Sequence, residues 1–389
     1  MPAMSLNDPK KYFYLKDGTS LRSIAELANA LDKMPDDVFN HHVSPDHNHF
    51  ASWIEEVFQE PHFAQSLRKV HTASQTSDML KRYLEKGHFV HEVIIIGGGI
   101  AGMSAALYAA RGRLDYLIIS PDFGGQMNVS GEIENYPGMA HTNFAEFQDK
   151  FREQMETNQI EFTDESVKQI KKLDDGHFQV VTDKNKYEAE TVILCTGARA
   201  RKLNIPGENE YEKKGVTYCH VCDGPLFKGK PVAIVGGGDA ALEAAAGMLR
   251  IASKIYLITI NPKMTGHQYL IDRVVGQDNV EVVANAKTVK ITGDKTVNGI
   301  VVEQGGKQRT LPVGGIIIEI GRVPNTELAK GLCDIDADNH IMVDKNMQTS
   351  VPGIFAAGDC ADGHEYQYVI SAGQAVYALL KAQRYIKRR

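Results

Sequence analysis

The chain has 389 residues, 43% of them hydrophobic and 24% charged, with a formal net charge of −6 and an isoelectric point near 6.2. This length and composition are typical of a globular protein of two or three domains, and the slight acidity gives no support to nucleic-acid binding, which usually requires a basic surface. The N-terminus lacks the apolar core of a signal peptide, and no apolar run is long enough to cross a bilayer. We therefore expect no membrane association and a cytoplasmic location.

Residues 1–87 show the periodicity of amphipathic helices. Apolar side chains recur three and four positions apart within 21–31, 50–58 and 63–70. A small all-α domain is therefore predicted, with Trp53 among the aromatic side chains of its core.

The same region is rich in histidine, since eight of the fourteen histidines lie at or before residue 91. Four of them fall within residues 41–49, "HHVSPDHNH". No cysteine accompanies them, and the histidine pair of zinc-enzyme helices, four residues apart, is absent. We predict solvated histidines here and no metal site, with metal binding by residues 41–49 as the alternative.

From residue 88 the pattern changes to short β-branched runs separated by helical stretches and glycine clusters, which is typical of parallel sheets with crossover helices. The first run, "VIII", leads into an alanine-rich helix through glycines at GxGxxG spacing, Gly97, Gly99 and Gly102. Such glycines permit a tight turn and a close approach of the backbone to a pyrophosphate at the helix N-terminus. A second run, "VAIV", repeats this context with Gly236, Gly238 and Ala241. Two bound nucleotides are predicted.

A third element lies near the C-terminus, where the apolar run "GIFAA" ends in Gly358 and Asp359 and a long helical stretch follows. An aspartate at this position can accept hydrogen bonds from the ribityl chain of a flavin. A glycine–aspartate pair at a strand end is by itself only a turn.

Together these segments resemble the low-molecular-weight thioredoxin reductases over nearly all of the chain from His91 onward. The motifs that carry the resemblance are "IIIGGGIAG", "GGQ" (124–126), "ENYPG" (134–138), "CTGA", "CHVCDG", "GGGDAALE", "GRVPNT" and "GIFAAGDC". The resemblance implies an α/β fold of two Rossmann-like three-layer nucleotide-binding domains, preceded by the all-α domain 1–87. The FAD domain consists of two parts, 88–205 and 326–389, and an NAD(P) domain, 206–325, is inserted between them.

The resemblance also implies a set of FAD contacts made by glycines and polar side chains: Gly97, Gly99, Gly102, Gly125, Gln126, Asn135, Thr196, Gly197, Gly358, Asp359 and Gln367. One departure from the family is "YQYV" at 366–369, where family members often have "RQA". Part of the expected contact with the isoalloxazine ring depends on this segment.

The pair Cys219 and Cys222 allows three interpretations: a metal clamp, a structural staple or a redox dithiol. A zinc site normally requires two more ligands at suitable spacing, whereas Cys195, Cys333 and Cys360 are isolated. A CxxC turn brings two sulfurs within disulfide reach beside a helix N-terminus, so we favour the redox dithiol. By resemblance, Cys222 exchanges electrons with the flavin, Cys219 attacks the disulfide of the partner, and Asp223 is the acid that manages the proton.

The electron donor is less well specified. Relatives that use NADPH hold its 2′-phosphate with arginines after the second strand, where this chain has Thr259, Ile260 and Asn261. The following segment resembles that of the NADH-dependent flavoprotein of alkyl hydroperoxide reductase, and Glu243 stands where the family places a glutamate near the nicotinamide. We favour NADH, with NADPH and ferredoxin or another donor as alternatives. Lys254 and Lys263 are candidate phosphate contacts for NADPH.

The expected function is that of a flavin-dependent disulfide reductase that passes electrons from a reduced nicotinamide through FAD and the Cys219/Cys222 pair to a thioredoxin-like or other small disulfide protein. The resemblance also implies a homodimer. A dithiol oxidase and a redox-sensing interaction protein are the alternative functions. Residues 1–87 are similar to a small helical domain of no assigned role that is attached to varied prokaryotic proteins.

Overall fold

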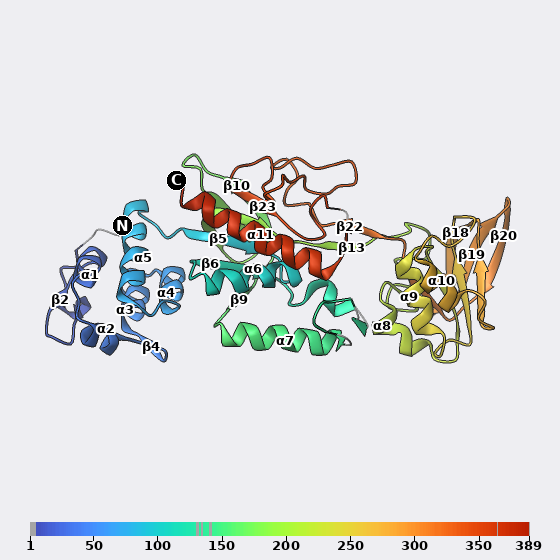
Figure 1. The fold of residues 1–389 in the computed structure, drawn as a ribbon, viewed down its shortest axis with the longest axis horizontal. Coiled ribbons are helices and arrows are strands. Elements are labelled where there is room, and N and C mark those ends of the chain that lie inside the picture. The colour runs from blue at the N-terminus through green and yellow to red at the C-terminus, as the bar shows by residue number, and fades with distance from the viewer. Residues whose placement is uncertain (1–4, 130–131, 134, 140–141, 364, 389) are drawn as a thin grey trace.

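The computed structural model describes residues 5–129, 132–133, 135–139, 142–363 and 365–388, so Glu134 of the "ENYPG" motif lies outside the described residues. Figure 1 shows three bodies in a row: a helical unit, a central unit with the C-terminal helix, and a unit formed by the third quarter of the chain. No helix in the described ranges is long and apolar enough to cross a membrane.

The helical unit contains the short helix η1 (Pro9–Lys11), two hairpins and five α-helices. The hairpins pair β1 (Phe13–Tyr14) with β2 (Ser20–Leu21) and β3 (Val43–Ser44) with β4 (His47–Asn48), and the sequence did not predict them. Side chains of Ser23, Asn48 and Thr72 cap three of the helices, because each accepts a hydrogen bond from a backbone N–H of the first turn. The helices are α1 (Ile24–Leu31), α2 (Asp36–His42), α3 (His49–Phe58), α4 (Pro61–Arg68) and α5 (Ala73–Lys86).

The core of this unit is apolar and aromatic. Phe50 and Phe63 are fully buried, and Trp53 is 6% exposed and donates its indole N–H to the carbonyl of Lys11 at 2.8 Å. Phe58, from the same predicted helical stretch as Trp53, packs against the Trp53 ring with centroids 5.1 Å apart. The predicted aromatic core of the helical unit is therefore present.

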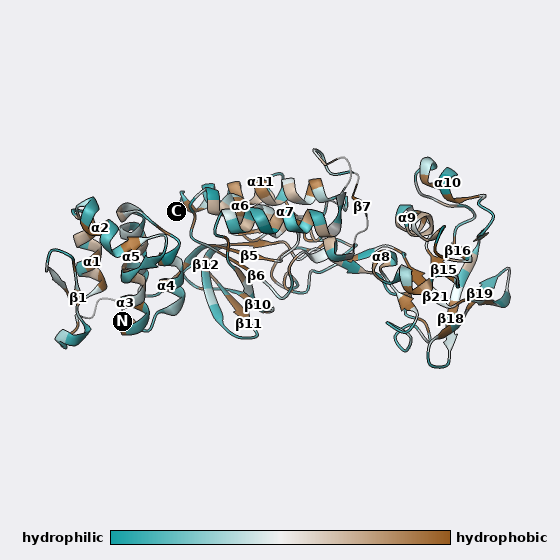
Figure 2. Cartoon of the chain, turned by 90° about the horizontal axis from the view of Figure 1, so that it is seen from below, coloured by the Kyte–Doolittle hydropathy of each residue, from teal (hydrophilic) through white to brown (hydrophobic). Residues whose placement is uncertain are grey.

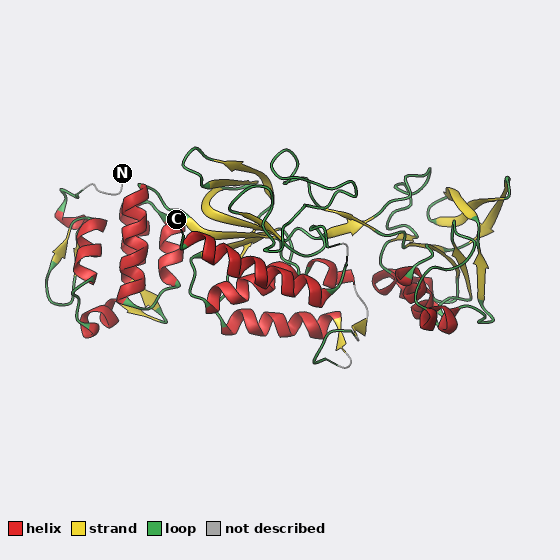
Figure 3. Ribbon diagram, turned by 45° about the horizontal axis from the view of Figure 1, so that its top comes forward, coloured by secondary structure: helices red, strands yellow, loops and turns green. Residues whose placement is uncertain are grey.

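The central unit is built on a seven-stranded sheet, ordered β10-β11-β12-β5-β6-β9, with β23 paired to β12. Strands β12, β5, β6, β9 and β23 run parallel, as the βα alternation predicted. Figure 3 shows α6 (Ile100–Arg111), α7 (Phe144–Thr157) and α11 (Tyr368–Ile386) together on one side of this sheet. The strands are β5 (His91–Ile96), β6 (Tyr116–Ser120), β9 (Phe162–Asp164), β10 (Val167–Lys172), β11 (Phe178–Thr182), β12 (Lys186–Leu194) and β23 (Ile354–Ala356).

The third unit has a five-stranded parallel sheet ordered β14-β21-β15-β16-β17, covered by α9 (Asp239–Met248) and α10 (Gln268–Val274), and an antiparallel sheet ordered β18-β19-β20. Figure 2 shows the central strands of both parallel sheets as largely hydrophobic, which is expected where helices or loops cover a sheet. The strands are β14 (Val216–Thr217), β15 (Pro231–Val235), β16 (Lys254–Ile258), β17 (Val280–Val283), β18 (Ala286–Gly293), β19 (Val297–Gln304), β20 (Lys307–Pro312) and β21 (Gly315–Ile318).

Two strands connect the central and third units. The chain leaves the central unit through β13 (Ala198–Ala200) and returns through β22 (Arg322–Pro324), and the two pair antiparallel. The predicted boundaries after residues 205 and 325 lie shortly beyond this ribbon and stay a prediction.

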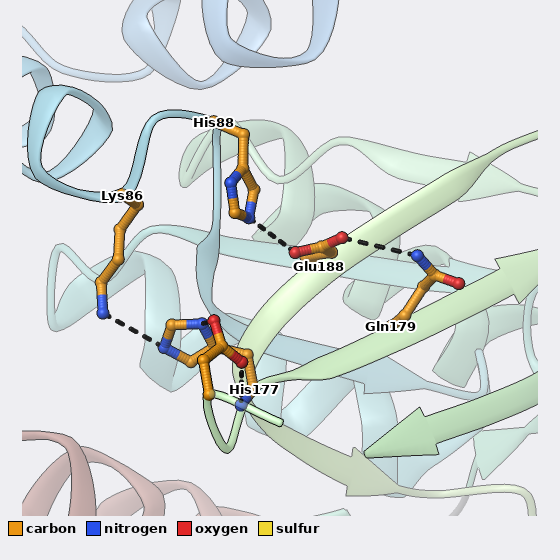
Figure 4. A network of polar contacts seen from close by, with 6 residues as sticks. Lys86, His88, His177, Gln179 and Glu188 are labelled. Carbon is orange, nitrogen blue, oxygen red and sulfur yellow. Dashed lines mark hydrogen bonds and ion pairs between the residues drawn. The ribbon is translucent and has the colours of Figure 1, made fainter. Parts of the chain in front are cut away.

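The helical unit is joined to the central sheet by polar contacts at the start of β5. Figure 4 shows His88 paired with Glu188 of β12, 2.7 Å apart, and Lys86 3.3 Å from the ring of His177. Deeper in the joint, Arg82 of α5 pairs with Glu92 at 2.9 Å. The two units therefore share a charged, partly buried contact at the N-terminal ends of the strands.

Candidate functional site: a nucleotide cavity beside a disulfide

The first glycine turn connects β5 to α6 and leaves no room for a side chain at two of its three glycines. Gly97 has φ +120°, and a Cβ on it would lie 2.1 Å from the carbonyl oxygen of Cys195. A Cβ on Gly102 would lie 1.8 Å from the oxygen of Gly97. At Gly99, by contrast, no atom lies within 4 Å of such a Cβ, and no side chain caps α6 there. The turn thus leaves space and backbone N–H groups at a helix N-terminus, which suits a phosphate.

A cavity of about 660 Å³ opens at this turn. Its walls come from the β5–α6 turn, the end of β6, the segment around η2 (Gly125–Val129), the end of β12 and the segment after β23. The predicted FAD contacts among its lining residues are Gly97, Gly99, Gly125, Gln126, Thr196, Gly197, Gly358 and Asp359. The volume of the cavity and its glycine-rich lining fit a dinucleotide such as FAD.

Three predicted contacts do not line the cavity. Gly102 packs beneath the turn, where its lack of a side chain permits the close approach of Gly97. Asn135 donates its side-chain amide to Gln367 at 3.0 Å, which brings the segment after η2 to the start of α11. Lining residues that the sequence reasoning missed include Asp122, Asn128, Asn325, Tyr368 and Ser371.

Asp359 is a half-buried acid in the wall of the cavity. Burial raises its pKa, whereas a hydrogen bond from Ser371 at 3.0 Å and the nearby Arg322 oppose the rise. Arg322 also donates to the side chain of Gln126. A carboxylate at this position in the wall can accept a hydrogen bond from a ribityl hydroxyl.

The two cysteines form a disulfide at the start of the short helix α8 (His220–Asp223). Cys219 is 8% exposed, whereas Cys222 is exposed and its sulfur lies 3.7 Å from the carbonyl oxygen of Asn128. Because Asn128 lines the cavity, the disulfide stands at the edge of the proposed flavin site. Asp223 is half-buried at the end of the same helix.

The second glycine turn connects β15 to α9. A Cβ on Gly236 would lie 2.1 Å from the oxygen of Glu319 and 2.9 Å from the Cβ of Ala241, so the small residue at position 241 is required. Gly238 precedes α9 with no atom within 4 Å of a Cβ and without a side-chain cap. The geometry of the first turn is thus repeated.

Glu243 lies on α9 near the disulfide helix. Burial raises its pKa, the carboxylates of Asp239 and Glu319 raise it further, and His220 lowers it. His220 lies between the two cysteines in sequence, and its ring nitrogen is 3.9 Å from Glu319. The imidazole therefore connects the dithiol helix to the carboxylates beside the second turn, a role that the sequence reasoning missed.

The structure separates the two lysines proposed for phosphate binding. Lys254 is the first residue of β16 and is paired with Glu281 at 2.7 Å, so it lies at the opposite end of the strand from Thr259. It is not a phosphate contact at that strand end, and this expectation was wrong. The strand end itself exposes Ile260, at 74%, and Lys263 is also exposed.

The histidines of the helical unit lie close together, and His42 is buried, so the prediction of solvated histidines was wrong for this residue. Among the described residues, no group of three or more histidines, cysteines and acids has the geometry to hold a metal ion. His42 accepts the N–H of Lys16 at its Nε2 atom, and its Nδ1 atom faces Nδ1 of His49 at 3.4 Å. Burial and the neighbouring histidines lower the pKa of His42 to about 4.

Comparison with known proteins identifies relatives of this chain. Residues 91–377 match the family described as pyridine nucleotide-disulphide oxidoreductase. An NADH dehydrogenase of Bacillus subtilis (strain 168) is 38% identical over 301 residues, 76% of this chain and 59% of that protein. An alkyl hydroperoxide reductase component of Staphylococcus aureus (strain MRSA252) is 38% identical over 77% of this chain and 59% of its own length. A crystal structure of Lactococcus lactis thioredoxin reductase matches 77% of this chain and 100% of its own, with 32% identity and a TM-score of 0.74.

Two glycine turns, with a disulfide at the edge of the cavity beside the first, are typical of flavoprotein disulfide oxidoreductases. The chain belongs to the pyridine nucleotide-disulphide oxidoreductase family, in its thioredoxin-reductase-like branch, which confirms the predicted resemblance and fold class. Members of this family use FAD and a pyridine nucleotide. The chain spans about 59% of the length of the curated relatives named above, and its first 90 residues lie outside the matched family segment.

Proposed function

We propose that the protein is a disulfide reductase of the thioredoxin-reductase type, which uses NADH and FAD to reduce a small disulfide protein. The observation that carries the proposal is the contact of the Cys222 sulfur with Asn128, because it brings the only described disulfide to the wall of the FAD-sized cavity. FAD, when bound, supplies two-electron transfer between a nicotinamide and a disulfide.

Each reactive residue then has a distinct task. Two electrons and two protons convert the Cys219–Cys222 disulfide into two thiols. Cys222 is the sulfur nearer the cavity, and Cys219 attacks the disulfide of the partner, forming a mixed disulfide that Cys222 resolves. Asp223, one residue beyond Cys222, holds the proton that the departing thiolate receives.

A movement of the third unit is part of this proposal. Cys219 is buried in the present arrangement and cannot be reached by a protein disulfide. The two-stranded ribbon of β13 and β22 is the connection about which the units can rotate. Rotation exposes Cys219 and gives a nicotinamide at the second turn access to the cavity.

We propose NADH as the donor because the strand end after β16 offers no guanidinium group to a 2′-phosphate. Thr259 is buried, and its hydroxyl oxygen accepts a hydrogen bond from the backbone N–H of Asn261 at 3.2 Å. The Thr259 hydroxyl is therefore already bonded within the turn. The name of the Bacillus subtilis relative, NADH dehydrogenase, also supports NADH.

The experiment is an anaerobic titration of the purified yellow protein with NADH, NADPH and reduced ferredoxin, followed by the loss of flavin absorbance. NADH is expected to bleach the flavin at the lowest concentration. Bleaching by ferredoxin alone would contradict the nicotinamide donor and leave the disulfide chemistry intact.

For the partner we propose a thioredoxin-like or peroxiredoxin-type protein disulfide, as the names of the relatives suggest. Cys219→Ser and Cys222→Ser should each abolish its reduction while FAD stays bound, and Cys333→Ser, which replaces a buried free cysteine, is the matched control. Reduction by either single variant would overturn the dithiol assignment. Rapid consumption of oxygen with the dithiol form of the partner, in the absence of any nicotinamide, would favour the dithiol oxidase.

We also propose a homodimer. Large apolar side chains are exposed along α11 and on the adjacent α6, at Tyr108, Val369, Ile370, Tyr377 and Leu380. Sedimentation of the wild type against a Tyr377→Glu/Leu380→Glu variant tests whether this face is the contact, and a monomeric wild type would contradict the dimer.

A further inference from the structure

The side chain of Gln126 contacts both strands of the ribbon that connects the central and third units (Figure 1). Its amide nitrogen donates to the carbonyl oxygen of Ala198 in β13 at 2.7 Å. Its amide oxygen accepts a hydrogen bond from the guanidinium of Arg322 in β22. Ala198 and Arg322 are each the first residue of their strand, and the strands run antiparallel, so these two residues lie at opposite ends of the ribbon. A single side chain therefore holds the central-unit end of the ribbon to its third-unit end.

The segment that carries Gln126 is fixed to the central unit. The backbone N–H of Gly124 donates to the carbonyl of Gly98 in the first glycine turn at 2.8 Å. The hydroxyl of Tyr368, at the start of α11, donates to the carbonyl of Gln126 at 3.3 Å. The position of the Gln126 side chain is therefore set by elements of the central unit.

The same segment contacts the disulfide two residues further along the chain. The sulfur of Cys222 lies 3.7 Å from the carbonyl oxygen of Asn128. The side chain of Asn128 accepts a hydrogen bond from Gln148 of α7 at 2.8 Å, which fixes this residue as well. The η2 segment thus contacts the third unit at two places, the ribbon and the disulfide.

A rotation of the third unit affects both contacts together. Arg322 follows directly from the third unit, so it moves with that unit when the ribbon twists, whereas Gln126 stays with the central unit. The rotation therefore separates Arg322 from Gln126 as it moves Cys222 away from Asn128. Gln126 and Arg322 are both half-buried, and a hydrogen bond from a guanidinium is stronger than one between neutral groups.

We propose that Gln126 and Arg322 form a latch, which holds the third unit in the arrangement that places the disulfide at the cavity and which opens when Cys219 is presented to the partner. Both act by placing the disulfide and are positioning residues. The sequence predicted Gln126 as an FAD contact, whereas its side-chain amide is bonded to the ribbon. The proposal rests on the movement of the third unit proposed above and is independent of the electron donor and of the identity of the partner.

The test measures alkylation of Cys219 by iodoacetamide in the full chain carrying Cys222→Ser, in which Cys219 has lost its disulfide partner. Mass spectrometry identifies the modified cysteine. Adding Arg322→Met or Gln126→Met should raise the alkylation rate of Cys219 by about 10-fold, the usual effect on an equilibrium of losing one hydrogen bond to a charged group. The variant with both changes should react no faster than Gln126→Met alone, because the two substitutions remove the same interaction.

Two controls separate the latch from a general loosening of the protein. Arg199→Met removes a guanidinium of the same ribbon that donates to Asn325 at 2.7 Å, and its rate should equal that of the parent. The buried free cysteines should stay unmodified in every variant: Cys195, Cys333 and Cys360.

Equal rates in the parent and in both latch variants would overturn the latch and leave the proposed disulfide chemistry intact. An equal increase in Arg199→Met, or modification of the buried cysteines in the latch variants, would also overturn it, because the faster reaction would then reflect loss of packing. If one latch variant fails to fold, the other decides. A parent in which Cys219 reacts as fast as in the denatured chain would overturn both the latch and the movement on which it rests.

Discussion

At the scale of single residues, we expect the nucleotide preference to depend on two side chains. Ile260 and Asn261 follow β16, and a Cβ on Gly237 in the second turn would meet the hydroxyl of Thr259 at 2.6 Å and the amide of Asn261 at 3.6 Å. The residues after the strand therefore lie beside the glycine turn, where the adenosine ribose of a dinucleotide is expected. Ile260 is exposed here and contributes no charge.

Replacing both residues, Ile260→Arg/Asn261→Arg, should favour NADPH. Charge-assisted hydrogen bonds to the added phosphate contribute about 1–3 kcal/mol, which corresponds to roughly 5- to 150-fold in the ratio of the two dissociation constants. The measurement is the binding of NADH and NADPH to each variant. Tyr269→Arg, at an exposed site on α10, controls for added charge. An unchanged ratio would show that this strand end does not face the ribose.

At the scale of the element, an alanine at two positions of the β5–α6 turn should have two different effects, one on stability and one on FAD binding. Gly97→Ala places a Cβ 2.1 Å from a backbone oxygen and forces φ +120° on an L-residue, so the apoprotein should lose stability by about 1–3 kcal/mol or more. Gly99→Ala meets no protein atom and has φ −79°, so its apoprotein should be as stable as the wild type but bind FAD more weakly. Thermal unfolding of the apoproteins and FAD titration distinguish the two variants. Equal FAD affinity of Gly99→Ala and the wild type would show that the pyrophosphate does not bind at this turn.

The histidine cluster makes the helical unit sensitive to acid. The pKa of His42 is about 4 in the folded chain and 6.5 as the reference value, so the unfolded state binds more protons between these values. The contribution of neutral His42 to the free energy of unfolding is therefore complete above about pH 6.5 and decreases as the pH falls toward 4. After allowance for partial solvent screening, we expect the free energy of unfolding to decrease by about 1–2 kcal/mol over this pH range.

The measurement is chemical denaturation of the full chain across this pH range, followed by the fluorescence of Trp53, the only tryptophan. His42→Asn should flatten the pH dependence, whatever its effect on stability at neutral pH. His71→Asn, an exposed histidine 3.5 Å from Gln159, should retain the wild-type slope. Equal slopes in all three proteins would contradict the role of His42.

At the scale of the whole molecule, the helical unit and the third unit lie at opposite ends of the central unit (Figure 1). The helical unit contacts the N-terminal ends of the strands, whereas the cavity opens at their C-terminal ends. It therefore does not touch the disulfide in this arrangement. One of its contacts with the central unit joins Gln65 to Glu161 at 2.9 Å. The pair of His91 and Asp115, 3.2 Å apart, lies at the same joint.

A chain that begins at His88 should still bind FAD and accept electrons, because the cavity contains no residue of the helical unit. It should be less stable by about 1–3 kcal/mol, since Glu92 loses Arg82 and Phe89 loses its stacking partner Phe63. Flavin content and thermal unfolding are the measurements. Arg82→Met in the full chain isolates the contribution of the ion pair. A colourless or insoluble product would show that the boundary drawn after residue 87 is wrong.

Features that are local along the chain could be predicted from the amino-acid sequence. Each glycine fingerprint lies within one strand–turn–helix segment, where steric limits act between neighbouring residues, so Gly97, Gly99 and Gly236 were predictable. The helical stripes of residues 1–87 and the cysteine pair were predictable for the same reason. The β-hairpins of two residues per strand were too short to leave a periodic signal.

Contacts between distant segments depend on the tertiary structure. Cys222 and Asn128 are 94 residues apart, and Arg322 and Gln126 are 196 apart. These contacts join helices, loops and the connecting ribbon from separate parts of the sequence, and only the tertiary structure brings them together. The lining residue Ser371 had no local signal, because it becomes part of the site only where distant segments of the chain meet at the cavity.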